Sequence, residues 1–198
     1  MPSPKLSPRQ GNSRRLDVAL VLTAAAQLVD RDGPEALTLT SLANELGIKP
    51  PSLYAHVESL AALRKQTAVL GLEELERALL RAGFAKTAEA ALHAMFRAYR
   101  EFGLKRPGLY ATTYLWTGPE NPKALEISSR IGSAVMQALD PLFDGLEKEE
   151  RIHRLRIMRV ALHGFTSLES AKAFWEPTDL GDTFQHLLNS LEAIAKAR

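Results

Sequence analysis

A stretch near the N-terminus combines polar and apolar side chains of the kinds that contact the edges of base pairs. Lys49 can donate a hydrogen bond to guanine or to a phosphate, and Ser52 can donate or accept one. Pro50, Pro51 and Ala55 can make apolar contact with a thymine methyl group, although the two prolines also fit the start of a helix. Because few of these groups are polar, base recognition would also depend on the shape of the DNA.

Two short helices joined by a glycine turn would present these side chains on one face. Gly47 ends the first helix, because glycine adopts the left-handed conformation without steric cost. The second would run from about Pro50 to Val57, since proline is tolerated in the first turn of a helix. This is the helix-turn-helix pattern, whose second helix lies in the major groove. Apolar residues at helical spacing would face the core: Leu39, Leu42, Ala43, Leu46, Ile48, Leu53 and Val57.

Two threonines mark the start of the first of these helices. Thr38 and Thr40 lie beside its first apolar residue, and a threonine side-chain oxygen can cap a helix N-terminus. Thr40 could also contact a phosphate, because the N-terminus of a helix attracts anions. Both threonines therefore join the candidate DNA-binding residues.

Three segments of this stretch resemble the DNA-binding region of the TetR family of transcriptional regulators: Leu39-Thr40-Ser41-Leu42-Ala43, Gly47-Ile48 and Leu53-Tyr54-Ala55-His56-Val57. The resemblance implies that Tyr54 and His56 hydrogen-bond to phosphates and set the register on the duplex; the alternatives are packing for Tyr54 and an ordinary surface position for His56. Relatives often carry a lysine near the start of the next helix, where this chain has Leu60, and Arg64 or Lys65 could replace it. The predicted DNA-binding residues are Thr38, Thr40, Lys49, Pro50, Pro51, Ser52, Tyr54, Ala55, His56, Arg64 and Lys65.

The C-terminal part resembles the regulatory domain of one TetR subgroup, which is named for a Trp-His-Gly (WHG) motif. The matching segments are Arg159-Val-Ala-Leu-His-Gly-Phe-Thr-Ser-Leu-Glu169 and Thr183-Phe184-Gln-His-Leu-Leu188, and the tripeptide is Leu162-His163-Gly164, with leucine in place of the tryptophan. The resemblance implies a homodimer that binds a palindromic operator through two DNA-reading units. It places the dimer face on the last two long helices, which carry more apolar surface than one internal face needs. They could also be ordinary core helices.

The resemblance further implies that the middle helices enclose a cavity for a small-molecule effector, with no other cofactor. A ligand pocket is mostly apolar with a few polar groups. Each candidate could instead pack in the core, and His163 could hydrogen-bond a neighbouring backbone group. The predicted wall residues are Met95, Phe96, Tyr99, Tyr110, Tyr114, Trp116, Met136, His163 and Phe165.

Amphipathic helical patterns account for most of the remaining chain. The predicted helices span 17–32, 60–82, 87–105, 107–116, 123–143, 148–174 and 180–197. No run of alternating apolar residues is long enough for a sheet, so the predicted fold class is all-α. We expect a flexible basic arm at 1–15, a three-helix helix-turn-helix DNA-binding domain at 16–62 with its motif at about 38–57, and a helical ligand-binding and dimerisation domain at 63–198.

The N-terminal arm is the most basic part of the chain. The net charge of the whole chain is only +2, so a globally basic surface is not the argument for nucleic acid. A basic arm ahead of a helix-turn-helix can follow phosphates or enter the minor groove; the alternative is a solvated, disordered tail. Four basic residues precede the first acidic one, namely Lys5, Arg9, Arg14 and Arg15.

Composition narrows the other classes of function. The 198 residues, 45% of them apolar, suffice for one or two cores. The chain has no cysteine for a disulfide or a thiolate metal site. No apolar run approaches the ~20 residues that span a bilayer, and the N-terminus lacks a signal-peptide core, so we expect a cytoplasmic protein without membrane contact. The five histidines have no metal-binding spacing, and neither a phosphate-binding loop nor a nucleophile elbow is present, so we expect no enzyme, no catalytic residues and no metal.

The sequence therefore predicts a ligand-responsive transcriptional repressor that binds double-stranded operator DNA. Repression is preferred because most TetR relatives repress, and a ligand-responsive activator of the same family stays open. A helical protein-interaction module is the other alternative. It would explain the amphipathic helices but not the capped pair of short helices, the glycine turn or the Leu-Tyr-x-His sequence at 53–56.

Overall fold

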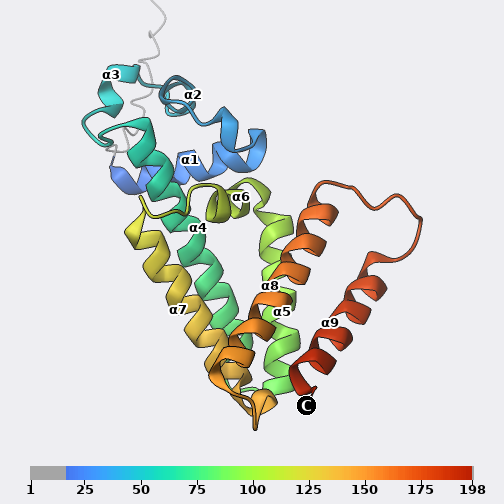
Figure 1. The fold of residues 1–198 in the computed structure, drawn as a ribbon. Coiled ribbons are helices and arrows are strands. Elements are labelled where there is room, and N and C mark those ends of the chain that lie inside the picture. Colours follow the sequence, from blue (N-terminus) through green and yellow to red (C-terminus); the bar gives the residue numbers. More distant parts are fainter. Residues whose placement is uncertain (1–16, 198) are drawn as a thin grey trace, which may run out of the picture.

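The computed structural model describes residues 17–197, and it contains helices but no strand over that range (Figure 1). The predicted all-α class is therefore confirmed. The predicted basic arm, with Lys5, Arg9, Arg14 and Arg15, lies outside the described residues. The α-helices are α1 (Val18–Asp32), α2 (Leu39–Glu45), α3 (Pro50–Leu53), α4 (Leu60–Gly83), α5 (Ala88–Lys105), α6 (Pro107–Leu115), α7 (Pro122–Leu139), α8 (Lys148–Ser170) and α9 (Leu180–Lys196), with 3-10 helices η1 (Pro34–Ala36) and η2 (Asp140–Phe143).

The helices α1, α2 and α3 form a small unit at one end of the molecule (Figure 1). Val29 of α1, Leu42 of α2 and Leu53 of α3 are fully buried in one shared cluster. Two of the loops in this unit require glycine, since φ is 87° at Gly33 and 66° at Gly47. The turn predicted at Gly47 is thus present, and it sets the direction in which α3 leaves α2.

The helix α4 leads from this unit into the rest of the molecule (Figure 1). It begins at Leu60, where the side-chain oxygen of Ser59 accepts a hydrogen bond from the amide of Ala62 at 3.1 Å. Its 24 residues extend for about 36 Å at the usual rise per residue. Because α4 packs against α1 as well as α5, α6 and α7, one continuous helix contacts both parts of the chain.

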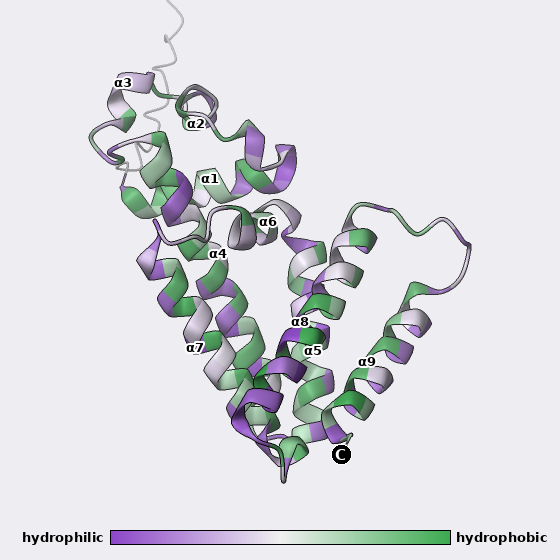
Figure 2. Cartoon of the chain, in the orientation of Figure 1, coloured by the Kyte–Doolittle hydropathy of each residue, from purple (hydrophilic) through white to green (hydrophobic). Residues whose placement is uncertain are grey.

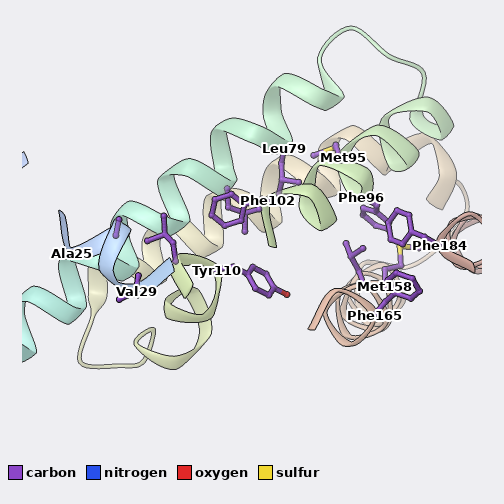
Figure 3. Close-up of a cluster of buried hydrophobic side chains, with 14 of the residues drawn as sticks. Ala25, Val29, Leu79, Met95, Phe96, Phe102, Tyr110, Met158, Phe165 and Phe184 are labelled. Carbon is purple, nitrogen blue, oxygen red and sulfur yellow. The ribbon is translucent and has the colours of Figure 1, made fainter. Parts of the chain in front are cut away.

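An apolar core joins α5, α8 and α9. The ring centroids of Phe165 on α8 and Phe184 on α9 lie 5.2 Å apart, and Phe96 and Met158 gather beside them (Figure 3). Hydrophilic residues are concentrated around the α7–α8 connection and the first turns of α8 (Figure 2). No helix within residues 17–197 is both long enough and apolar enough to cross a bilayer.

A buried arginine holds the end of the last helix. Nη1 of Arg154 on α8 donates to the backbone carbonyl oxygens of Ile194 at 2.9 Å and Ala195 at 3.2 Å. Nε of the same side chain donates to Glu150 at 2.8 Å. The last carbonyl groups of a helix lack partners within it and attract positive charge. Arg154 therefore caps α9 from within its own chain.

Two predicted helix ends are wrong, one in the helix-turn-helix motif and one in the middle of the chain. The helix α3 ends at Leu53 instead of Val57, because Val57 is buried and the chain turns inward through residues 54–56 to reach it. The helix predicted at 123–143 ends at Leu139, and the 3-10 helix η2, which contains Pro141, completes it. Proline removes one amide donor and disfavours a continuing α-helix.

The helix α8 ends at Ser170, four residues before the predicted position. Lys172 adopts the left-handed conformation with φ of 54°. Its amide donates to the carbonyl of Glu169 at 3.0 Å, and the amide of Ala173 donates to the carbonyl of Leu168 at 2.8 Å. These two bonds form the helix-ending motif that usually requires glycine. A lysine in this role could not be recognised from the sequence.

Candidate nucleic-acid interface and central cavity

The cap of α2 uses the hydroxyl groups that precede it. Oγ1 of Thr38 accepts a hydrogen bond from the amide of Ser41 at 3.0 Å, and Oγ of Ser41 accepts one from the amide of Thr38 at 3.0 Å. This reciprocal capping box fixes the first turn of α2. Thr40 is exposed beside it. The structure therefore gives Thr38 a capping role, and it leaves Thr40 accessible at the N-terminus of the helix.

Most of the predicted DNA-reading side chains share one exposed surface around α3. Tyr54 is 60% exposed, which favours a surface role over the packing alternative. Leu53 and Val57 point the other way and are buried, so they anchor the segment to α1 and α2. Lys49, Pro51, Ser52 and Ala55 are exposed, and Pro50 and His56 are partly exposed. We call the surface formed by residues 49–52 and 54–56 the α3 face.

The structure places Arg64 away from the α3 face. The guanidinium carbon of Arg64 lies 5.3 Å from the ring centroid of Trp116, which follows α6. Its Nε is buried and has no hydrogen-bond partner among the described residues. Arg64 thus packs at the contact between α4 and the end of α6, and this placement argues against the phosphate contact predicted for it. Lys65 is partly exposed, and its backbone carbonyl accepts a bond from Asn121 at 3.1 Å.

An ion-pair junction joins α1, α4 and α6, and the sequence analysis missed it. Nε of Arg106 lies 2.5 Å from Oδ2 of Asp30 on α1, and its Nη1 lies 2.6 Å from Oε2 of Glu74 on α4. The other carboxylate oxygen of Asp30 accepts the amide of Leu109 at 2.8 Å. A Cβ added to Gly108 would lie only 1.8 Å from the carbonyl oxygen of Val29. These contacts, which we call the α1–α4–α6 junction, fasten the end of α1 to the start of α6.

A cavity of about 1190 Å³ opens among α4, α5, α7 and α8. Four predicted wall residues line it, namely Met95, Phe96, Tyr99 and Met136. The other five predicted wall residues, Tyr110, Tyr114, Trp116, His163 and Phe165, do not line it. The reason is the rotation of α6 and α8, which turns these side chains toward other partners. Trp116 packs against Arg64, and Phe165 packs against Phe174 and Phe184.

Three of the remaining aromatic residues form a cluster behind the cavity wall. The hydroxyl of Tyr110 lies 3.0 Å from that of Tyr99 and also hydrogen-bonds to Nδ1 of His163. The ring of Tyr114 meets His163 edge-on at 4.8 Å. Burial raises the pKa of Tyr99 and of Tyr110, and burial followed by the charge of Arg159 lowers the pKa of His163. Tyr99 therefore links the cavity by a hydrogen bond to a cluster that is buried at Tyr110, partly exposed at His163 and exposed at Tyr114.

No group of three or more histidine, cysteine, aspartate or glutamate side chains within residues 17–197 is placed to hold a metal ion. The α3 face, the α1–α4–α6 junction and the cavity are the features that a function has to explain.

The sequence of the chain is similar to that of known proteins. Residues 92–191 match the family model described as "Tetracyclin repressor-like, C-terminal domain". The chain is 30% identical over 176 residues to the uncharacterized HTH-type transcriptional regulator YobS of Bacillus subtilis, covering 88% of each protein. The chain belongs to the TetR family. It is 32% identical over 150 residues to the uncharacterized HTH-type transcriptional regulator Rv0681 of Mycobacterium tuberculosis, covering 75% of this chain and 68% of that protein.

The fold of this TetR-family chain is also found among solved structures. A protein of unknown function from Rhodococcus sp. RHA1 superposes with a TM-score of 0.77 at 20% identity, over 93% of this chain and 97% of that one. Similarity at this level of identity shows the fold alone. Together with the two relatives, the family membership makes the chain a helix-turn-helix transcriptional regulator, with α2 and α3 as its helix-turn-helix.

Proposed function

We propose that the protein is a repressor that binds a palindromic DNA operator as a homodimer and releases it when a small molecule fills the cavity. The observation that carries this proposal is the path of α4. One end of α4 follows directly on the α3 face, and Leu72, Leu75 and Leu79 further along the same helix line the cavity. A change at the cavity can therefore move the DNA-reading surface without an intermediate linker.

The proposed DNA-binding unit comprises residues 16–62, with 63–198 as the regulatory and dimerisation domain and 1–15 as a basic arm. Lys49 and Ser52 would contact base edges, while Tyr54 and His56 would donate to phosphates. The exposure of Tyr54 supports this assignment, because an exposed tyrosine on a short, anchored helix is free to reach the DNA backbone. In this proposal the protein acts in the cytoplasm, and it has no catalytic activity.

The proposed dimer forms through α8 and α9. Three large apolar residues on the outer side of α8 are exposed, namely Ile157 at 53%, Val160 at 71% and Leu168 at 47%. Gly164 lies between them at helical spacing, and a Cβ there would have no neighbour within 4 Å. A second copy of α8 could therefore approach closely along this stripe. In the proposed WHG-type subgroup, Leu162-His163-Gly164 would occupy the position of the motif.

The proposed switch is a shift between two dimer shapes. The α1–α4–α6 junction makes α6 and the DNA-binding unit move together, and Thr113 of α6 also lines the cavity. A ligand that fits one shape better favours that shape by at most its difference in affinity for the two. If the favoured shape has the wrong spacing between the two α3 faces, operator affinity falls.

The test of this function is selection of bound DNA from a random pool by the purified full-length protein. We expect an inverted repeat, with half-sites separated by about one helical turn or a multiple of it. The operator so found would then be titrated in the presence and absence of candidate ligands. A single unrepeated site, or no enrichment above the starting pool, would contradict the proposal of a dimeric operator-binding protein.

A further inference from the structure

The inner wall of the cavity is apolar. Its deepest side chains come from α4 and α5, namely Leu72, Leu75, Leu79, Met95 and Phe96. All five are buried. The volume, about 1190 Å³, exceeds the range of about 300–1,000 Å³ typical of pockets for drug-sized ligands. The interior thus suits a long apolar group.

The opening of the cavity lies between α7 and α8, because the exposed lining residues are on these two helices and on the connection between them. On α7 they are small, and they include Ser129, Gly132 and Ser133. A Cβ added to Gly132 would have no neighbour within 4 Å. A ligand can therefore enter from this side without displacing a large side chain, and the serine hydroxyl groups can hydrogen-bond to a polar head group.

The α8 side of the opening is basic. Within residues 17–197, three cations that line the cavity, Lys148, Arg156 and Arg159, form no ion pair with an acidic side chain, and the lining carboxylate of Glu147 forms none with a basic one. Arg151 is different, because its guanidinium is paired with Asp140. Burial, and after it the charge of Arg159, lowers the pKa of His163, which hydrogen-bonds to Tyr110. The unpaired cations therefore outnumber the unpaired carboxylate of Glu147, and the rim is net positive above an apolar interior.

We propose that the effector of this protein is a single-chain amphiphilic anion with a long alkyl group. Its negatively charged head group binds between Arg156 and Arg159 at the opening, and its alkyl chain lies against the α4–α5 wall. This inference rests on the proposed ligand-responsive function, and it adds the chemical class of the ligand. Arginine pairs with a carboxylate or with a phosphate in the same two-pronged geometry, so both head groups belong to the class.

Titration calorimetry with the full-length, delipidated protein and no DNA tests the class directly. The probes are dodecanoate, dodecyl phosphate, dodecanol and dodecyltrimethylammonium, each below its micelle-forming concentration. We expect the two anions to bind at one molecule per chain and at least tenfold more tightly than the alcohol or the cation. Decanoate should bind on the order of tenfold more weakly than dodecanoate, because two buried methylene groups are lost. Equal binding of dodecanol or of the cation, or no binding of either anion, would overturn the proposal.

Charge variants test the head-group position. In the double variant Arg156→Gln and Arg159→Gln, we expect dodecanoate affinity to fall at least tenfold and dodecanol affinity to stay the same. The matched control is Arg77→Gln, since Arg77 is an exposed arginine on α4 that does not line the cavity. The double lysine variant at 156 and 159 should restore most of the affinity, which separates lost charge from a damaged fold. Unchanged dodecanoate affinity in the glutamine variant would refute the assigned position.

The effector class and the proposed regulatory function can be refuted independently. If a palindromic operator is found but neither anion binds, the effector class is wrong and the DNA-binding function stands. If dodecanoate binds as expected but leaves operator affinity unchanged, the cavity assignment stands and ligand-responsive repression is wrong.

Discussion

Gly108 lies where α6 approaches the backbone of α1 most closely, and its replacement by alanine tests the α1–α4–α6 junction. The added Cβ would lie 1.8 Å from the carbonyl oxygen of Val29 and 2.7 Å from the amide nitrogen of Asp30, whereas ordinary contact begins at 3.4 Å. These obstacles are backbone atoms, so no side chain can rotate away. Either α6 or the end of α1 has to move.

We expect the free energy of unfolding to fall by a large amount for the addition of one methyl group. Overpacking of a core typically costs about 1–3 kcal/mol, and the backbone position of the clash favours the upper end, about 3 kcal/mol. For a chain of this size, each kcal/mol lowers Tm by about 2–4 °C, so we expect Tm to fall by about 6–12 °C. Displacement of α6 should also weaken operator binding about tenfold, within the usual range of coupling between sites.

The assay is thermal unfolding at a fixed protein concentration, followed by titration of the selected operator. The concentration is fixed because the proposed dimerisation would make Tm concentration-dependent. The matched control is Gly132→Ala, which adds the same methyl group on α7 where no atom lies within 4 Å. That change should stabilise the helix by about 0.5–1 kcal/mol. If Gly108→Ala unfolds at the wild-type temperature and binds the operator normally, the junction does not couple the two parts of the molecule.

Three further predictions concern separate surfaces. Lys49→Ala should weaken operator binding and reduce the salt dependence of binding by about one phosphate equivalent. It should leave Tm unchanged, since Lys49 is exposed. Replacing Lys172, another exposed lysine, by alanine should change neither operator affinity nor its salt dependence. Because its folded-state pKa is lowered, His163 binds its proton less readily in the folded chain, so stability should fall as pH drops below about 6.5. Unfolding by denaturant between about pH 7.5 and 5.5 measures this loss, which His163→Asn should remove. Val160→Glu should give a folded monomer by analytical ultracentrifugation, whereas Leu80→Glu, at another exposed apolar residue, should remain dimeric. An unaltered salt dependence, an unchanged pH profile or a persistent dimer would contradict the respective prediction.

The helix-turn-helix was predictable because its determinants are local. The hydroxyl cap at Thr38, the glycine turn at Gly47 and the prolines that open α3 each act within about one turn of the helix they define. The same reasoning failed at the end of α8, where Lys172 takes a conformation usually reserved for glycine. Local patterns predict a helix end when the residue type matches the backbone conformation, and they miss it otherwise.

The cavity wall was only partly predictable, because periodicity does not determine which apolar face turns inward. Tyr99 and Met136 line the cavity as expected, whereas Tyr110 and His163 hydrogen-bond to each other behind its wall. Arg106 pairs with Asp30 across 76 positions of sequence, and no local pattern relates the two. Such contacts depend on how the helices pack, and the order of residues along one helix does not specify them.

The cap that Arg154 places on α9 bears on domain swapping. Residues 171–179 form an irregular connection before α9, and such connections allow a terminal helix to exchange between two copies of a chain. For α9 to leave, the buried guanidinium of Arg154 would lose the carbonyl groups of Ile194 and Ala195, and Phe184 would leave the ring of Phe165. While α9 is out of place, Arg154 would keep only its bond to Glu150, so opening the chain for an exchange is costly. We therefore expect α9 to exchange slowly, and the proposed dimer to assemble from folded protomers that each keep their own α9.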